Sequence, residues 1–379
     1  MSFSSVIELT PISPVFIGCD EKIERFETVV EGNTVYVLDF EKLLSDEHFV
    51  ELFVERRKDI LDVRTKDSAI KDILKSLNLK LSDVSLVSFP ALRKPNGEVV
   101  NLQMRRFVRT AGRHYVPGSS IKGAFRTALI KSNENLMRSF ENELNEFLRR
   151  SEPGQERAQG RQRQDPNFEG KIFGTPQESL FRLIRFSDSE FIDRKFIGFR
   201  LVYSMSLANK RTKIPTMLEL WLPSRENSNK VRALYQVKLD GFERNVNNVA
   251  NLLDMLRSKE RLIETMKKAN RKIINLELER LKNAVKTEYT QRLSAFYNEL
   301  QRMNEQIKDG FLLRLGAGGG FYSKTIFIRL LNDREKQFLS KFYKRVNPNV
   351  FPASIVVSQV QVDHLSSVPL GWIKVRFVS

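Results

Sequence analysis

The stretch Val116-Pro117-Gly118-Ser119-Ser120-Ile121-Lys122-Gly123-Ala124-Phe125-Arg126-Thr127-Ala128-Leu129 places a turn, a helix start and two cations close together. A Pro-Gly pair favours a tight turn, and serines directly after it are typical caps for the helix that follows. Apolar residues then recur at helical spacing, so one face of this helix is expected to pack against a core. Lys122 and Arg126 are four residues apart and project together from another face. This combination suits the phosphates of a nucleic-acid backbone.

A second glycine-rich stretch lies far downstream, at Arg314-Leu315-Gly316-Ala317-Gly318-Gly319-Gly320-Phe321, and Lys324 follows it. Glycine adopts positive φ and carries no Cβ, so such a loop lets an RNA strand or a neighbouring subunit approach its backbone closely. Glycine runs also serve as hinges or packing loops, and the sequence leaves that alternative open. Neither glycine stretch fits a nucleotide-binding signature. The first lacks the Gly-x-x-x-x-Gly-Lys-Ser/Thr spacing, and Phe321 stands where Gly-x-Gly-x-x-Gly needs its last glycine.

The composition points to an anionic partner. The 379-residue chain carries 63 Lys and Arg against 46 Asp and Glu, for a formal net charge of +17. This excess favours nucleic acid, ahead of an anionic membrane surface and of a surface that is basic for solubility alone. Cys19 is the only cysteine and the three histidines are far apart, so we expect no disulfide, no metal site and no cofactor. No run approaches 18 apolar residues and the first residues do not resemble a signal peptide, so we expect a soluble cytoplasmic protein.

The hydrophobic pattern predicts an α+β chain. Helical periodicity with many charges predicts a helical insertion over 41–81, and the helix that starts near Gly118 is expected to continue to Phe147. Residues 251–309 predict one long amphipathic helix, or two helices joined near Ala269-Asn270. We expect two parts, residues 1–243 and residues 244–379. Runs of strand-forming residues predict strands at 5–18, 34–38, 183–186, 197–203, 217–222, 233–239, 355–362 and 371–378.

At these motifs the sequence resembles the RAMP (repeat-associated mysterious protein) superfamily of CRISPR effector subunits. Two elements are specific as a pair: the Pro-Gly-Ser-Ser-x-Lys-Gly helix start within Val116–Arg126 and the glycine-rich loop Arg314–Phe321. Ile7–Gly18 resembles the first strand of the family with its following glycine. Ile172-Phe173-Gly174 resembles its short Phe-Gly element, and Gly371-Trp372-Ile373-Lys374 its usual ending. Together these elements span most of the chain.

Within the superfamily, length and motif order most resemble the Csm-type subunit at the 3′ end of the guide RNA in type III-A interference complexes. The resemblance implies a ferredoxin-like (RRM-like) core with helical insertions and a second α+β half. It implies the guide RNA (crRNA) and the other subunits of the complex as partners, with target RNA as a further candidate. It also implies a role in guide maturation and antiviral defence without catalysis. Related backbone subunits cut target RNA with an aspartate after the first strand, but the surroundings of Asp20 do not match well enough to carry that role over.

We therefore expect a non-catalytic RNA-binding protein that holds guide phosphates without reading base sequence. Lys122, Arg126 and the backbone of Gly118–Ser120 are expected to hold the phosphates, with Arg113 and His114 at the rim. The complete set of expected RNA-binding residues is Arg105, Arg106, Arg109, Arg113, His114, Gly118, Ser119, Ser120, Lys122, Gly123, Arg126, Arg314, Gly316, Gly318, Gly319, Gly320 and Lys324.

Two other functions stay open at this point. In the first, the protein is a guide-processing endoribonuclease of the same superfamily, in which His114 acts as general acid or base and Lys122 stabilises the charge on the scissile phosphate. In the second, the basic surface meets only protein partners and the chain is a scaffold.

Overall fold

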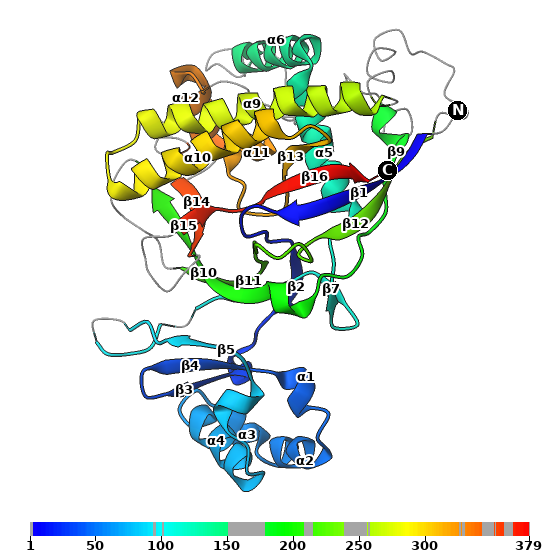
Figure 1. The fold of residues 1–379 in the computed structure, drawn as a ribbon. Helices are drawn as coiled ribbons and strands as arrows, with labels where there is room; N and C mark the ends of the chain where they lie inside the picture. Colours follow the sequence, from blue (N-terminus) through cyan, green and yellow to red (C-terminus); the bar gives the residue numbers. More distant parts are fainter. Residues whose placement is uncertain are drawn as a thin grey trace.

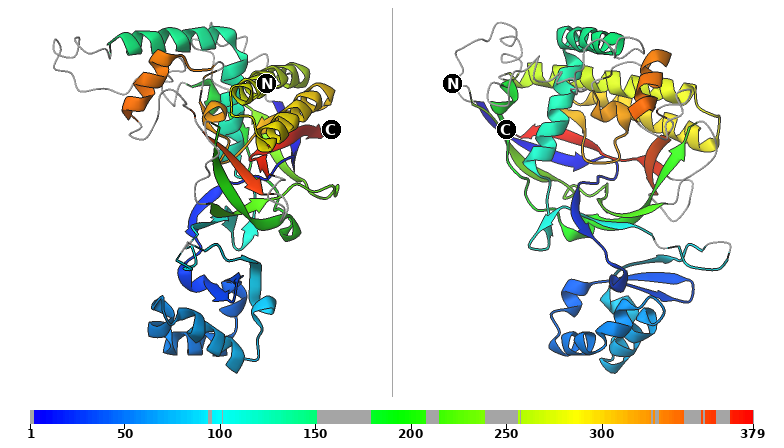
Figure 2. Two further views of the ribbon diagram at one scale, coloured as in Figure 1. Left: turned by 90° about the vertical axis from the view of Figure 1, so that its left-hand side faces the viewer. Right: turned by 180° about the vertical axis from the view of Figure 1, so that it is seen from behind.

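The structure, a computed structural model, describes residues 3–93, 96–100, 102–150, 179–207, 215–238, 256, 258–325, 327, 330–342, 352, 354–359 and 367–378. It confirms the expected α+β class, because two large β-sheets, a small third sheet and many helices make up these residues. Long helices gather at one end of the molecule and a small lobe lies at the opposite end (Figures 1 and 2). The expected Phe-Gly element Ile172-Phe173-Gly174 falls outside the described residues.

The central sheet has five strands in the order β13–β16–β1–β12–β9, and every neighbouring pair is antiparallel. In β12 and β16 most of the alternate apolar side chains are buried, as expected for strands with one face on a core. The strand expected over residues 5–18 is shorter in the structure. It ends at Pro11, the first of the two prolines in that stretch. The five strands are β1 (Phe3–Pro11), β9 (Ile184–Phe186), β12 (Val231–Val237), β13 (Gly310–Arg314) and β16 (Trp372–Val378).

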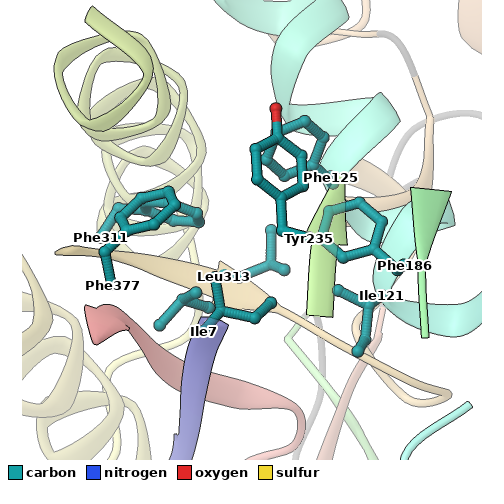
Figure 3. Close-up of a pocket in the computed structure, with 9 residues that line it drawn as sticks. Ile7, Ile121, Phe125, Phe186, Tyr235, Phe311, Leu313 and Phe377 are labelled. Atoms are coloured by element: carbon teal, nitrogen blue, oxygen red, sulfur yellow. The ribbon is translucent and has the colours of Figure 1, made fainter. Parts of the chain in front are cut away.

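The helices α5 (Gly118–Ser132) and α9 (Lys259–Lys282) pack on one face of this sheet. The apolar residues expected to face the core from α5, Ile121, Phe125, Ala128 and Leu129, are all buried. Between the helices and the sheet lies a cluster of aromatic rings that includes Phe125, Tyr235, Phe311 and Phe377 (Figure 3). The space that these rings surround has no room for a water molecule, so α5 packs tightly against the central sheet.

The second sheet has six strands in the order β15–β14–β10–β11–β6–β2, with β11 and β6 parallel and the other pairs antiparallel. The helix α10 (Glu288–Gln306) packs beside α9, and its apolar face shares a core with β10 and β14. The sequence predictions for the strands near 197, 217 and 355 are confirmed. The strands are β2 (Gly18–Lys22), β6 (Met104–Phe107), β10 (Ile197–Ser206), β11 (Thr216–Trp221), β14 (Ser354–Gln359) and β15 (Ser367–Pro369).

Residues 28–90 form a separate unit, which we call the N-terminal lobe (Figures 1 and 2). It has its own antiparallel sheet and its own apolar core, centred on residues such as Phe49 and Ile70. The helical insertion expected over 41–81 is thereby confirmed. The elements of the lobe are β3 (Thr28–Glu31), β4 (Thr34–Leu38), α1 (Phe40–Leu43), α2 (Glu47–Glu55), α3 (Arg57–Leu61), α4 (Lys66–Ser76) and β5 (Ser85–Pro90).

Two expected helices differ from the structure. The helix that starts at Gly118 was predicted to run to Phe147, but α5 ends at Ser132 and α6 (Glu134–Arg150) starts anew. Asn133 between them has an extended backbone, with φ −92° and ψ 110°, and its side chain accepts a hydrogen bond from the Leu136 N–H. Asparagine therefore ends one helix and caps the next.

Residues 259–306 of the predicted region form the two long helices α9 and α10, in agreement with one of the two alternatives, but the expected junction is wrong. Ala269 and Asn270 are buried within α9. The break comes later, between Asn283 at the end of α9 and Thr287, whose hydroxyl accepts the Thr290 N–H at the start of α10.

The expected division between residues 243 and 244 lies outside the described residues. Strands from both sides of it pair in the central sheet, and the division itself stays a prediction. No helix among the described residues is long and apolar enough to cross a membrane. The remaining elements are β7 (Arg109–Thr110), β8 (Arg113–His114), α11 (Phe321–Lys324), α12 (Asp333–Phe342) and short 3₁₀ turns at Arg25–Glu27, Leu81–Val84, Leu180–Arg182 and Arg194–Phe196.

Candidate nucleic-acid interface

The first turn of α5 is held against the loop that follows β9. The N–H of Gly118 donates a 2.8 Å hydrogen bond to Asp188 Oδ1, and the N–H of Val116 donates one of 2.9 Å to Ser189 Oγ. A Cβ at Gly118 would lie 2.3 Å from the carbonyl oxygen of Phe186, so a glycine is needed for this close approach. The Gly118 N–H is engaged within the chain, and the phosphate contact expected from it is not available in this conformation.

The outer face of α5 remains open to solvent. Ser119 and Gly123 are exposed, and a Cβ at Gly123 would meet no atom within 4 Å. Ser120 is half-buried, and its N–H donates a 3.0 Å hydrogen bond to the carbonyl oxygen of Pro117. The helix start therefore offers its side chains and its surface, rather than free backbone N–H groups at Gly118 and Ser120, to a ligand.

Three cations converge beside this surface: Lys122 and Arg126 from α5, and Arg185 from the edge strand β9. We call them the α5 cation cluster. Burial lowers the pKa of Lys122, and the positive charges of Arg185 and Arg126 lower it further. Cations that repel one another in this way create a positive potential that a phosphate would relieve.

The surroundings of Arg126 orient its guanidinium. Its carbon Cζ lies 5.1 Å from the centroid of the Phe181 ring, a cation–π distance. The ring lies in the 3₁₀ turn just before β9, so the same segment that contributes Arg185 also positions Arg126. The helix start and β9 thus form one electropositive surface.

Arg185 is the cluster member that the sequence analysis missed. It stands in the predicted strand Leu183-Ile184-Arg185-Phe186, where Ile184 is buried and Arg185 is exposed. The alternation of apolar and polar residues was the signal that could have assigned it to the outer face. Its closeness to Lys122 depends on the fold, because β9 lies far along the chain from α5.

Three arginines expected near the helix start have different surroundings. Arg105 on β6 is exposed. Arg109 is paired with Glu21 at 2.8 Å and with Glu41 of the lobe, so two carboxylates oppose its single charge. Arg113 is exposed and lies over the ring of Phe191, 3.7 Å from its centroid. Arg105 and Arg113 can thus add positive field, whereas Arg109 instead fastens the lobe.

Arg106 and His114 lie in the interior, which corrects their expected places on an exposed surface. Arg106 is 5% exposed and its Nη2 lies 2.7 Å from Glu27 Oε1. His114 is 6% exposed and its Nε2 lies 3.4 Å from Glu219 Oε2. Burial alone would raise the pKa of the Glu219 carboxyl. Its contacts with His114, with the N–H of Phe107 and with the charge of Arg106 nevertheless lower this pKa below its ordinary value. Arg106 and His114 are therefore each paired with a buried carboxylate, Arg106 with Glu27 and His114 with Glu219.

The glycine-rich loop packs against the chain itself at two of its glycines, and the expected approach of RNA or a neighbouring subunit to it stays a prediction. Gly316 has φ +77°, and a Cβ there would lie 2.1 Å from the carbonyl oxygen of Phe16. Gly318 has φ +81°, and a Cβ there would lie 2.6 Å from the Leu370 side chain. The next residue, Gly319, is buried, whereas a Cβ at Gly320 would meet nothing within 4 Å. These glycines hold together the segments that follow β1 and precede β16.

The cations that flank this loop also differ from one another. The Arg314 side chain is 3% exposed, and its Nη1 donates to Ser323 Oγ at 2.8 Å and lies 3.5 Å from Glu277 Oε1. It is a buried structural group and not the surface contact expected. Lys324 is exposed, and partial burial lowers the pKa of its ammonium group, with a smaller contribution from Arg314. Of the two, Lys324 alone is available to a ligand.

Comparison with known proteins agrees with these motifs. The family model of the RAMP superfamily matches residues 8–323, which include the end of strand β1, the helix start of α5 and the glycine-rich loop. The chain belongs to the RAMP superfamily. Its sequence is 23% identical to the "CRISPR system Cms protein Csm5" of Methanocaldococcus jannaschii over 97% of this chain and 87% of that protein. A protein of the same description from Streptococcus thermophilus is 23% identical over 89% of this chain and 85% of that one.

The fold of this RAMP protein is also similar to solved structures along its whole length. A chain of the cryo-EM structure of a Csm-crRNA-target RNA ternary complex in a type III-A CRISPR-Cas system matches with a TM-score of 0.62 and 19% identity, over 100% of both chains. The crystal structure of T. onnurineus Csm5 matches with a TM-score of 0.54 and 19% identity, over 97% of this chain and 99% of that one.

The RAMP protein shows no metal-binding group in the part of the chain that the structure describes. No set of three or more His, Cys, Asp and Glu side chains there could hold a metal ion. Asp20, which follows the first strand, is exposed on β2. In the α5 cation cluster, Arg185 is exposed and Lys122 and Arg126 are half-buried, and the three positive charges can attract a phosphodiester backbone.

Proposed function

We propose that this RAMP protein is the Csm5 subunit of a type III-A CRISPR effector complex and that it holds the crRNA without cutting it. Two curated relatives described as Csm5 match most of the chain, and the fold is similar to a chain of a Csm complex with crRNA and target RNA. Its partners are then crRNA, the other Csm subunits and target RNA. The subunit works in the cytoplasm, caps the filament near the 3′ end of the crRNA, and supports crRNA maturation and antiviral defence.

The core of the protein is ferredoxin-like in this proposal. Its support is the order of elements: β1, α5, β9, β12, α9 and β16 follow one another as βαββαβ, and the four strands lie in the order β16–β1–β12–β9. In the order of the chain these are strands 4, 1, 3 and 2, with an additional strand, β13, at one edge. This is the split βαβ arrangement. It brings the start of α5 beside the end of β9, where the cation cluster lies.

The α5 cation cluster is the observation that carries RNA binding. Lys122, Arg126 and Arg185 come from two elements of a packed core, and burial, followed by the positive charges of Arg185 and Arg126, lowers the pKa of Lys122. Phosphates of the RNA neutralise this repulsion. Because phosphate contacts carry no sequence information, such a cluster accepts any guide.

The test is a triple variant, K122A/R126A/R185A, compared with the charge-matched control K282A/K286A/K308A, whose three lysines are exposed elsewhere. Binding of crRNA is measured between 50 and 300 mM salt. Losing three phosphate contacts is expected to reduce the slope of log affinity against log salt by about 2, at about 0.7 per contact of single-stranded RNA. The loss should be equal for unrelated guide sequences. An unchanged slope, or a loss that depends on base sequence, contradicts the proposal.

A further inference from the structure

The N-terminal lobe differs in charge from the rest of the molecule. Residues 28–90 carry 12 Asp and Glu against 9 Lys and Arg, a net charge of −3. The remaining residues carry 54 Lys and Arg against 34 Asp and Glu, a net charge of +20. The net charge of this unit therefore gives no long-range attraction for a phosphodiester backbone, in contrast to the charge of the remaining residues.

The lobe also presents apolar side chains to solvent. Seven large apolar side chains are exposed in the described part of the chain, and four of them belong to these 63 residues. Leu61 is 72% exposed and Val63 is 65% exposed, the two largest values among the seven. Leu44 and Val54 are each 52% exposed. A small unit that exposes this many large apolar side chains is a candidate for contact with other proteins.

These side chains are not needed by the core of the lobe. That core is made by other residues, among them Phe49, Ile70 and Leu74, which are at most 2% exposed. The turn that carries Leu61 and Val63 is fixed by its own hydrogen bonds. There, the side chain of Asp62 accepts the Arg64 N–H at 2.9 Å. The apolar pair is thus held in place before any partner arrives, which lowers the entropy cost of binding.

Carboxylates accompany the apolar residues on α2. Glu47, Glu51 and Glu55 are exposed and follow one another at four-residue spacing, so they share one side of the helix. Val54 is exposed between the last two of them. The surface therefore fits a partner whose apolar contact residues are bordered by lysine or arginine.

The lobe is fastened to the body of the protein, so a contact made by the lobe fixes the whole subunit. Arg109 on β7 pairs with Glu41 on α1, and Arg194 pairs with Asp39 at 2.9 Å. Apolar residues of the lobe sheet, among them Val37, also pack with Met104 of β6. A partner bound to the lobe would consequently be held at a set position relative to the α5 cation cluster.

We propose that the N-terminal lobe is a protein-docking site for a neighbouring subunit of the same ribonucleoprotein complex, and that RNA does not bind it. This proposal rests on the proposed function, because it requires a multi-subunit complex. Proteins that share one RNA have basic surfaces for the same electrostatic reason as this chain, and an acidic lobe complements such a surface. Leu61 and Val63 are the apolar contacts, and the α2 carboxylates direct the approach.

The test uses the full chain co-expressed with its sibling Csm subunits and a crRNA. The variants are L61S/V63S and E47K/E51K/E55K, and the control is V285S, which changes an apolar side chain that is 42% exposed on the main body. Two quantities are measured: the fraction of the chain that co-purifies in the assembled complex, and the crRNA affinity of the isolated chain.

We expect L61S/V63S to weaken incorporation into the complex at least about tenfold, the equivalent of about 1.4 kcal/mol, while its crRNA affinity stays within about twofold of the wild type. E47K/E51K/E55K should also reduce incorporation, and V285S should behave as the wild type. Normal incorporation of both lobe variants overturns the proposal, and so does a lower crRNA affinity of L61S/V63S. An isolated wild-type chain that is dimeric, and becomes monomeric in L61S/V63S, would assign the surface to a second copy and also overturn it. Failure of the wild-type chain to join the Csm subunits at all would instead contradict the proposed function.

Discussion

The imidazole of His114 lies 3.4 Å from the carboxylate of Glu219 in the interior of the protein, at the end of the hairpin of β7 and β8. The same carboxylate accepts the N–H of Phe107 at 2.9 Å. His114, which the sequence allows as a general acid or base, is therefore paired with a buried carboxylate. The same carboxylate also fixes the backbone of strand β6 at Phe107. This pairing separates a structural function of His114 from a catalytic one.

Replacing His114 should change stability and not RNA chemistry. In H114A the Glu219 carboxylate loses a partner, and we expect the free energy of unfolding to fall by about 1–3 kcal/mol. H114Q restores a donor without an acid–base group and should recover part of the loss. Urea denaturation measures this. Incubation with repeat RNA in EDTA should give the same result for the wild type and both variants. Metal-independent cleavage that only the wild type performs would restore the endoribonuclease alternative.

The same pair predicts a pH dependence of stability. The pKa of Glu219 in the folded protein is below its ordinary value of 4.5, so its ionised form contributes stability that is present above the unfolded pKa. That contribution is lost as the pH falls through the folded pKa. Because His114 is one cause of the lowered pKa, H114A should lose less stability than the wild type on acidification from pH 5. Parallel curves for the two proteins would refute this coupling.

Lys131 should make the protein more stable at alkaline pH. It is fully buried, its ammonium group donates to the carbonyl oxygen of Tyr322, and burial lowers its pKa to about 7. Between pH 7 and 10.5 the unfolded chain holds a proton here that the folded chain has released. The free energy of unfolding should therefore rise by up to about 1.4 kcal/mol per pH unit from this group.

The variant K131M removes that titration, and K308M changes an exposed lysine as a control. Unfolding by urea is followed at pH 7, 8 and 9. The free energy of unfolding of the wild type relative to that of K131M should increase with pH. The curve of K308M should run parallel to that of the wild type. A difference that stays constant with pH would show that Lys131 does not titrate in this range.

Local features of the fold could be predicted from the sequence, and the partners of polar side chains could not. The turn at Gly118 and the buried stripe of α5 follow from spacing within one segment. The residues next to Arg106 in the chain do not indicate that Glu27 pairs with it, because the two are far apart in the sequence and the fold brings them together. In the same way, the sequence shows a run of glycines that includes position 316, but it does not show that the nearby carbonyl oxygen of Phe16 requires one there.

The candidate site shows the same division. Lys122 and Arg126 were predicted because one helix carries both of them. Arg185 joins them only through the pairing of β9 with β12, a long-range contact that a single sequence does not reveal. Asn133 was missed as a helix break because the apolar periodicity continues on both sides of it.

RNA affinity should depend on Lys122 at alkaline pH. Burial, Arg185 and Arg126 lower the pKa of this lysine, so in the free protein it loses its charge at a lower pH than an ordinary lysine does. Binding of a phosphate favours the charged form, and affinity should fall as the pH rises. K122R keeps its charge and should bind equally from pH 7 to 10. The binding measurements use a 2′-O-methyl RNA, which resists alkaline hydrolysis. An equal decline of RNA affinity in the wild type and in K122R would show that other groups are responsible.

Two glycines, one near the proposed RNA surface and one in the glycine-rich loop, should respond oppositely to alanine. At Gly316 the φ is positive and a Cβ would lie 2.1 Å from the Phe16 carbonyl oxygen, which leaves no room for a side chain. G316A should lower the free energy of unfolding by at least about 2 kcal/mol.

Gly123 lies within α5 with open space around it, so G123A should raise stability by about 0.5–1 kcal/mol through helix propensity. Urea denaturation of both variants measures this, and crRNA binding of folded G123A should match the wild type, because no side chain or backbone N–H of the cation cluster changes. A loss of crRNA affinity in G123A would mean that RNA passes closer to the α5 backbone than the cation cluster requires.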